Sequence, residues 1–228
     1  SARLDLESAA THLNAATRTL MLCGDRGGAA KSLIHAGELH MIRHDPVHAR
    51  TVLGQARDIC REDGLDALEA EALLGLGIAA RMGGDLGTAL DAFAEATALT
   101  DGHPILAAMV NAHKGATEAA CDAIENATEA LDLAEVQLEA GWDAVANTIH
   151  DALVGFVDLA RAREARLDDR QEDVDTHIDQ ALNRLARASS FETRSTPPRG
   201  RETPSRLNAL RLTRLLLDNA LGNIETGV

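Results

Sequence analysis

Apolar and polar residues alternate along most of the chain with the spacing of an α-helix. In residues 69–82 apolar side chains recur every three or four positions, and residues 86–99 repeat this pattern. Between them, Gly83-Gly84-Asp85 provides a residue that tolerates a left-handed conformation and an N-cap for the second stretch. Thr100-Asp101-Gly102 and Pro104 then end one helix and open another. The pattern therefore predicts helices joined by tight turns.

The helical pattern repeats along the chain with a period of 40 residues. The residues that recur at this interval are small or apolar: Gly24/Gly64, Leu33/Leu73, Gly37/Gly77, Ala9/Ala49/Ala89, Leu13/Leu53/Phe93 and Ala16/Ala56/Ala96. We expect Gly77 and Ala89 to lie where two antiparallel helices cross, because small side chains allow close approach. A single helix pair cannot bury its own apolar side, so the repeat predicts stacked pairs.

Further units follow the same scheme less regularly. Residues 30–61 form one unit, and residues 5–22 read as the second helix of a preceding repeat. Two later units have a glycine followed by apolar residues, namely Gly115 with Ala127, Leu131 and Ala134, and Gly155 with Val174, Ile178 and Ala181. A charged insertion, residues 161–173, separates the halves of the last unit.

Composition supports an all-α protein and narrows the classes of partner. Apolar residues make up 45% of the chain but aromatic residues only 2%, and Ala and Leu favour helices over strands. The net charge of −14 opposes direct binding to nucleic acid or an anionic membrane. Cys23, Cys60 and Cys121 form no CxxC motif, so we expect buried free thiols in a reducing compartment, which is the cytoplasm.

Residues 73–101 resemble one tetratricopeptide repeat (TPR). The matching positions are Leu76-Gly77, Ala80, Gly84-Asp85, Ala89, Phe93 and Ala96. The 40-residue period is similar to that of the longer repeats in large bacterial transcription regulators. The resemblance implies an all-α, TPR-like solenoid of antiparallel helix pairs over residues 1–190.

The composition changes after the predicted repeats. Residues 191–206 are rich in Pro, Ser, Thr and Arg and predict an exposed linker, and residues 207–228 predict a Leu-rich helix and a tail. We expect this C-terminal helix to cap the last repeat. It could also begin a further repeat, pair with a second chain, or fold back as an internal ligand.

The Gly- and Lys-containing stretch 23–32 invites comparison with a phosphate-binding loop. That motif requires Gly immediately before its Lys, where this chain has Ala30 before Lys31. No parallel-sheet pattern follows, and Gly24 recurs as Gly64. We therefore interpret the stretch as a turn between repeats.

His35, His40, His44 and His48 form the second candidate cluster, with the spacing that would align imidazoles for a metal on one straight helix. Asp45-Pro46 should end the first helix inside the cluster, and no acidic or Cys ligand stands at matching spacing. We expect solvated or helix-terminal histidines, although a pH-sensitive or metal-contacting turn stays open. No catalytic signature is present, so we expect no enzyme, no cofactor and no metal site.

In the TPR family the first helix of each pair lines a concave groove that binds a protein or peptide. Transferred by register, the groove residues are Lys31, Ile34, Glu38, Met41, Glu71, Leu74, Ile78, Arg81, Met109 and His113. Some of these positions could instead be core between helices. The resemblance implies a peptide-binding sensor or scaffold of a bacterial regulatory system. A small-molecule receptor that uses the same groove is the alternative, and a homodimer stays open.

Overall fold

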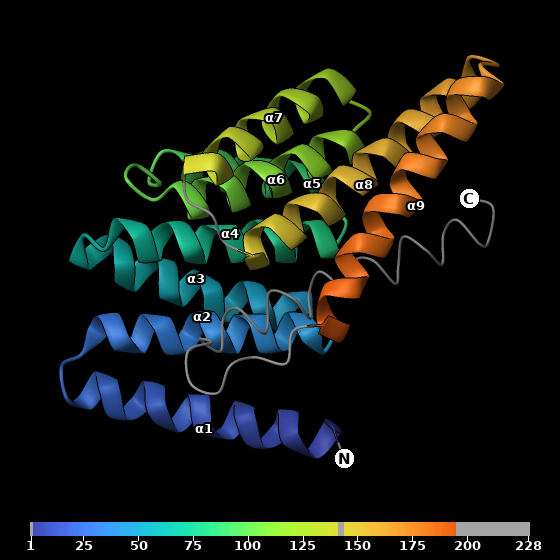
Figure 1. The fold of residues 1–228 in the computed structure, drawn as a ribbon. Helices are drawn as coiled ribbons and strands as arrows, with labels where there is room; N and C mark the ends of the chain where they lie inside the picture. The colour runs from blue at the N-terminus through green and yellow to red at the C-terminus, as the bar shows by residue number, and fades with distance from the viewer. Residues whose placement is uncertain (1, 141–143, 195–228) are drawn as a thin grey trace. The chain divides into compact units, whose positions relative to one another are not determined.

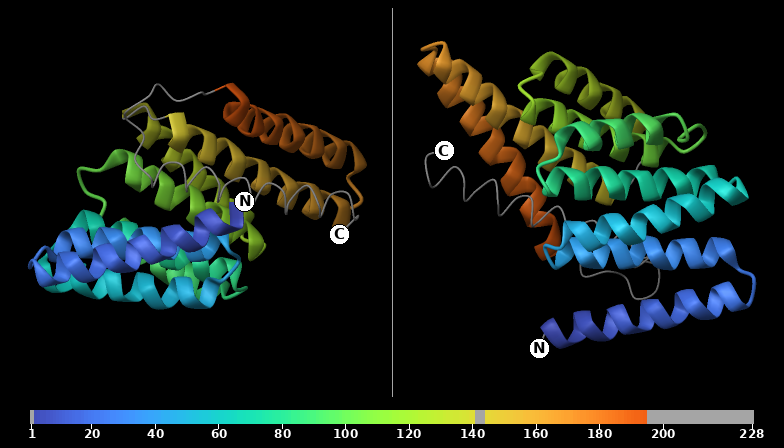
Figure 2. Two further views of the ribbon diagram at one scale, coloured as in Figure 1. Left: turned by 90° about the horizontal axis from the view of Figure 1, so that it is seen from below. Right: turned by 180° about the vertical axis from the view of Figure 1, so that it is seen from behind.

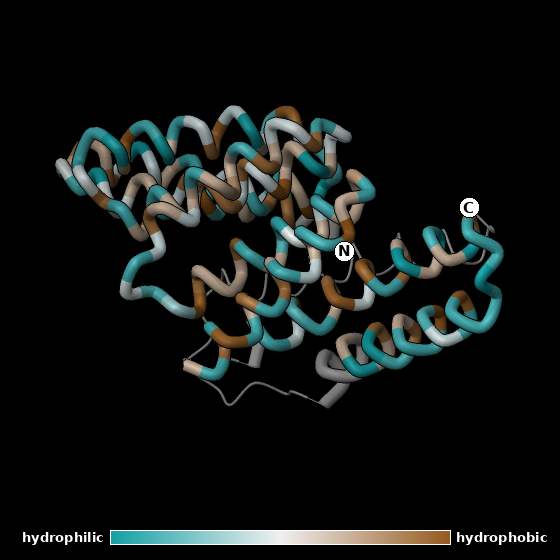
Figure 3. Tube along the Cα trace, turned by 90° about the horizontal axis from the view of Figure 1, so that it is seen from above, coloured by the Kyte–Doolittle hydropathy of each residue, from teal (hydrophilic) through white to brown (hydrophobic). Residues whose placement is uncertain are grey.

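The computed structural model describes residues 2–140 and 144–194, in which every regular element is an α-helix (Figure 1). The helices are α1 (Ala2–Leu22), α2 (Arg26–Ile42), α3 (Pro46–Asp63), α4 (Asp66–Met82), α5 (Leu86–Thr97), α6 (Pro104–Ala120), α7 (Ile124–Ala140), α8 (Ala144–Leu167) and α9 (Gln171–Arg194). Figure 3 shows apolar and polar positions alternating around each helix, as expected for helices with one buried side.

The turns between helices have a common design. Each of seven turns contains one residue with positive φ: Gly24, His44, Gly64, Gly84, Gly102, Asp122 and Asp169. A left-handed residue ends a helix because its backbone turns the chain away from the helix axis. The first four of these residues lie 20 positions apart, so the 40-residue repeat consists of two 20-residue helix-and-turn units.

Aspartate residues begin three of the helices in the way the sequence predicts for Asp85. The side chains of Asp25, Asp45 and Asp85 accept hydrogen bonds from the backbone N–H groups of residues 28, 48 and 88. Each bond satisfies a backbone donor that has no partner within the helix. The predicted turn at residues 83–85 is confirmed, since Gly84 is left-handed and Asp85 caps α5.

The chain divides into two compact units, residues 1–106 and 107–228. In the first unit, consecutive helices from α1 to α5 pack against each other, and α2 also packs against α4 (Figure 2). This contact between alternate helices is what stacking of helix pairs produces. The expected fold class, an all-α, TPR-like solenoid of antiparallel pairs, is confirmed.

A glycine marks the crossing point of each pair in the first unit. A Cβ atom added to Gly37 would lie 2.4 Å from Leu53 Cγ, and one added to Gly77 would lie 2.4 Å from Phe93 Cε1. The crossing predicted at Gly77 is therefore confirmed, and the side chain that fills it is Phe93. Ala89 is also fully buried. The same contact is made twice because its residues recur 40 positions apart.

Helix α1 corresponds to the second helix of a pair. In the structure it packs against one first helix, α2, whereas α3 packs against two, α2 and α4. Ala9, Leu13 and Ala16 are only partly buried, whereas their repeat equivalents in α3 are completely inaccessible to solvent. Leu53 of α3 lies against both Gly37 of α2 and Gly75 of α4. Helix α1 makes no contact equivalent to the one between Leu53 and Gly37.

The second unit repeats the glycine contact with one change of register. Gly115 faces Leu131 in the pair α6–α7, as the sequence pattern indicates. In α8–α9, Gly155 faces Ala181 and Leu185, not Val174 and Ile178. The charged insertion is the reason, because it lengthens both helices to 24 residues, against 17 in α6 and α7. About two extra turns per helix move the matching residues further along α9.

A buried carboxylate ties α8 to α9. Asp158 is almost completely buried, and its oxygens lie 3.1 Å from Arg161 Nη1 and 3.2 Å from Arg184 Nε. Arg161 also donates a hydrogen bond of 2.6 Å to Thr128 Oγ1 of α7. Two guanidinium groups therefore compensate the one buried charge, as a buried charge requires.

The predicted boundary near residue 190 falls inside a helix, because α9 continues to Arg194. The first residues of the predicted linker are therefore helical. The rest of that linker and the predicted C-terminal helix, residues 207–228, lie outside the described residues, and their role stays a prediction.

Candidate partner-binding face

The first helices α2 and α4 lie side by side and form the face that the sequence analysis assigns to partner binding. The repeat places equivalent residues 40 positions apart on this face, so that Lys31 corresponds to Glu71 and Ile34 to Leu74. Leu53 of α3 lies against Gly37 of α2 and Gly75 of α4. The two glycines allow one side chain to hold both first helices close together.

The predicted groove residues of the first unit separate into a buried apolar group and a more exposed charged group. Lys31 and Glu71 are exposed, and Glu38 and Arg81 are partly exposed. The apolar members are almost completely buried, with exposed fractions of 4% for Ile34, 1% for Met41, 6% for Leu74 and 6% for Ile78. The charged side chains, not the apolar ones, are therefore the accessible part of this face.

Several charged groups of the first unit act on one another across this face. His35 Nδ1 lies 3.2 Å from Glu38 Oε2. Although the Glu71 side chain is exposed overall, partial desolvation of its carboxylate raises its pKa. The nearby Glu38 carboxylate raises this pKa further, while Lys31, His35 and His103 oppose the shift. The charges come from α2, from α4 and from the residue that precedes α6, which are successive first helices of the repeat.

Two further predicted residues lie on α6 in the second unit. Met109 is partly exposed, and His113 is buried, with its backbone carbonyl accepting a hydrogen bond of 2.8 Å from Thr117 Oγ1.

In the first unit, burial lowers the pKa of Arg81 to about 10. A guanidinium with this pKa is still charged at neutral pH.

Neither His35 nor His103 was among the residues that the repeat register predicted for the binding face. His35 was considered only as part of a metal cluster, although Lys31 and Glu38, its neighbours on a helix surface, were already assigned to the face. His103 stands in a turn, for which the helical register gives no direction. Its approach to Glu71 depends on how α4 and α6 are connected.

The histidine cluster is divided by the turn between α2 and α3, as predicted from Asp45-Pro46. His40 lies in the last turn of α2, His44 is the left-handed turn residue, and His48 lies in the first turn of α3. The rings of His40 and His48 stack with centroids 5.5 Å apart. In the described part of the chain, no group of three or more His, Cys, Asp or Glu side chains has an arrangement that could hold a metal ion.

Asp45 links the two stacked rings. Its Oδ2 lies 2.7 Å from His48 Nδ1 and 3.6 Å from His40 Nδ1. Hydrogen bonds from His48 lower the pKa of Asp45. Burial lowers the pKa of His40, and although Asp45 opposes this shift, the charges of His48 and Arg43 add to it. The cluster therefore lies at the facing ends of two helices and in the turn between them.

The start of α2 is built as a turn rather than as a phosphate site. The Asp25 carboxylate accepts a hydrogen bond of 2.8 Å from the Gly28 backbone N–H, so the protein's own anion occupies this helix terminus. Arg26 turns towards α3, where its Nε donates to Asp63 Oδ2 at 2.9 Å. The interpretation of this stretch as an inter-repeat turn agrees with the left-handed Gly24.

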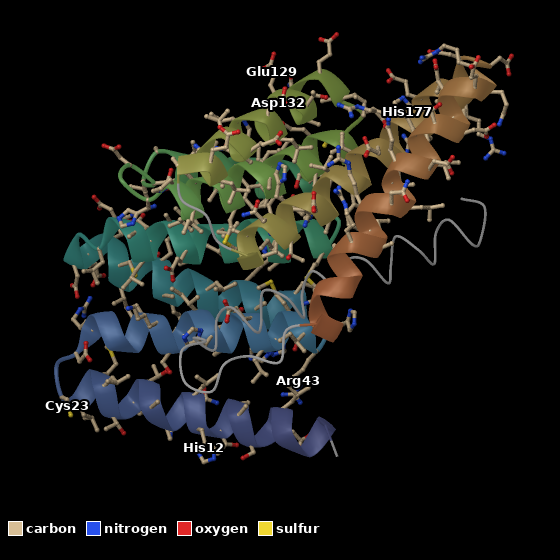
Figure 4. The ribbon with its side chains drawn as sticks, viewed as in Figure 1. His12, Cys23, Arg43, Glu129, Asp132 and His177 are labelled. Carbon is tan, nitrogen blue, oxygen red and sulfur yellow. The ribbon has the colours of Figure 1, made fainter. Side chains whose placement is uncertain are left out.

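The prediction of buried thiols is right for one cysteine and wrong for two. Cys60 is buried in α3, and burial raises the pKa of its thiol to about 11. Cys23 and Cys121 are exposed because each directly follows the end of a helix, at a turn, and Figure 4 shows Cys23 after α1. All three are free thiols.

Comparisons with known proteins show similarity among solved structures but not among families or curated proteins. No protein-family model matches the chain, and no curated protein matches it. Among solved structures, the MamA protein is similar, with a TM-score of 0.45 and 18% sequence identity, over 84% of this chain and 100% of that one. The fold class stated above therefore rests on the helices and their packing. None of the described helices is both long enough and apolar enough to span a membrane.

Proposed function

We propose that the chain is a protein- or peptide-binding module whose binding face is formed by the first helices α2 and α4. The observation that supports this proposal is the convergence of charged side chains on that face. Glu71 is influenced by Lys31, His35 and Glu38 of α2 and by His103. Charged side chains from successive helices that lie on one surface can all contact a ligand that extends along the stack.

The electrostatics of the face favour a partner that brings a positive charge to Glu71. The carboxylate is less solvated than usual and stands near Glu38, and both effects disfavour its ionised form. A Lys or Arg side chain of a partner would offset both effects, because its positive charge stabilises the ionised carboxylate. Lys31, which is exposed, provides an opposite charge beside it and would help to set the register of the bound segment.

We further propose that the module is the sensor or scaffold part of a bacterial regulatory system. Support comes from the 40-residue period and its resemblance to the long repeats of large bacterial transcription regulators. In that arrangement the charged face selects the partner, and the chain has no catalytic role of its own.

Affinity capture with exposed-residue variants tests the binding face. Substitution of Leu74 or Ile78 by Asp would place a charge in a nearly buried position and unfold the protein. We therefore choose Lys31→Glu and Glu71→Lys, whose sites are exposed. Asp91→Lys, at an exposed site on α5, is the control that matches the charge change of Glu71→Lys.

The purified chain would be used to capture proteins from its source organism, and bound proteins would be quantified by mass spectrometry. We expect a partner that Asp91→Lys retains and that both face variants lose by at least tenfold. Equal capture by all four proteins would reject the α2–α4 face. A small molecule found on the purified chain by native mass spectrometry, and lost from Glu71→Lys, would instead indicate a receptor.

A further inference from the structure

The outer side of α7 carries exposed apolar residues among acidic ones. Leu133 is 47% exposed and Val136 is 62% exposed. Helix α7 contains five acidic residues and no Lys or Arg. Its inner side, in contrast, buries Ala127, Leu131 and Ala134.

The exposed residues form a continuous stripe along α7. The members are separated by four, three, four and three positions, which places them on one side of a helix: Glu125, Glu129, Asp132, Val136 and Glu139. Leu133 borders this stripe. Figure 4 shows Glu129 and Asp132 directed outward from α7. Within the described part of the chain, none of these four carboxylates forms an ion pair.

The segment that follows α9 has the opposite character. Residues 195–228 contain five arginines and three acidic residues, whereas the rest of the chain contains 17 basic and 33 acidic residues. Read as the helix that its pattern predicts, the segment places Leu207, Leu210, Arg214, Leu217 and Leu221 on one side. Arg206 and Arg211 fall at the borders of that side. By sequence, the segment is therefore a basic, Leu-rich helix.

The connection is long enough for this segment to reach α7 in the same chain. Helices α8 and α9 run antiparallel, as the pairs Gly155–Leu185 and Asp158–Arg184 show, so Arg194 lies at the end of the hairpin where α8 begins. Helix α7 ends at Ala140, only four residues before α8. The 11 residues 195–205 can span up to about 37 Å, whereas α7 is about 25 Å long.

We propose that residues 206–221 fold back as a Leu-rich helix onto the outer side of α7 in the same chain. Arginines of the segment pair with Glu129 and Asp132, and its leucines cover Leu133 and Val136. The segment thereby acts as an internal ligand of the second unit. This inference is independent of the binding face on α2 and α4.

Hydrogen exchange of the full chain, measured by mass spectrometry, tests the contact. The variant Glu129→Arg/Asp132→Arg reverses the charge of the stripe, and Glu172→Arg/Asp179→Arg is the matched control on exposed positions of α9. We expect the amides of residues 207–221 to be protected in the wild type. They should exchange at least tenfold faster in the α7 variant and at an unchanged rate in the control.

A charge swap separates a lost contact from a damaged fold. Adding Arg211→Glu/Arg214→Glu to the α7 variant should restore protection, while those two changes alone should remove it. Unprotected amides in the wild type, or protection that survives the α7 reversal, would overturn the proposal. Protection that exists only in a dimer detected by light scattering would also overturn it, because a second copy would then be the occupant.

Discussion

The glycine at each helix crossing gives a quantitative test of the packing. In Gly77→Ala, the new Cβ would lie 2.4 Å from Phe93 Cε1 and 2.7 Å from Cδ1 and Cζ. Carbon atoms in contact normally lie about 3.5–4.0 Å apart, so the ring must move by about 1 Å. Phe93 is completely buried and close-packed, which leaves it little room to move.

Two opposing terms set the size of the effect. Overpacking of a core costs about 1–3 kcal/mol, and replacing Gly by Ala within a helix gains up to about 1 kcal/mol. We therefore expect Gly77→Ala to lower the free energy of unfolding by about 1–2 kcal/mol. Gly54→Ala is the control, because its Cβ would meet nothing within 4 Å. It should raise stability by about 0.5–1 kcal/mol.

Urea denaturation followed by circular dichroism measures both variants. A double-mutant cycle with Phe93→Val isolates the contact, because valine lacks the Cδ1, Cε1 and Cζ atoms that the new Cβ would meet. This change should reduce the cost of Gly77→Ala by at least about 0.5 kcal/mol. If Gly77→Ala were as stable as the wild type, or if Phe93→Val left its cost unchanged, the crossing point would be wrongly assigned.

Three further predictions concern titratable groups. In the native protein a thiol reagent should label Cys23 and Cys121 but not the buried Cys60, and denaturation should expose all three; rapid native labelling of Cys60 would contradict its burial. Glu71→Gln should leave the free energy of unfolding at pH 7 equal or raise it by up to about 0.5 kcal/mol. The reason is that the raised pKa of Glu71 means that folding disfavours its ionised form. In urea titrations this gain should vanish as the pH falls below the carboxyl pKa, because the wild-type side chain is then neutral as well. His40 has a lowered pKa in the folded state, so the unfolded chain binds its proton more readily and stability should fall as the pH drops below about 6.5; a His40→Gln variant with the same loss between pH 7 and pH 5 would contradict this.

The 40-residue repeat was visible in the sequence because its cause is local. A helix needs small residues wherever another helix crosses it, so Gly37 and Gly77 recur with the same period as Leu53 and Phe93. The Asp-capped turns are local too, since Asp85 bonds to a backbone group three residues away. Helical periodicity and turn chemistry therefore determined the fold class, most helix boundaries and the repeat length.

Only the tertiary structure decided which exposed positions remain accessible and which distant groups meet. Exposure of Ile34 and Leu74 depends on neighbouring helices, and both are nearly buried although the register placed them on the binding face. Similarly, the sequence grouped Gly155 with Val174, Ile178 and Ala181, whereas the longer α8–α9 hairpin brings Ala181 and Leu185 against it. Burial and long-range contacts depend on the packing of whole helices, which short-range periodicity does not encode.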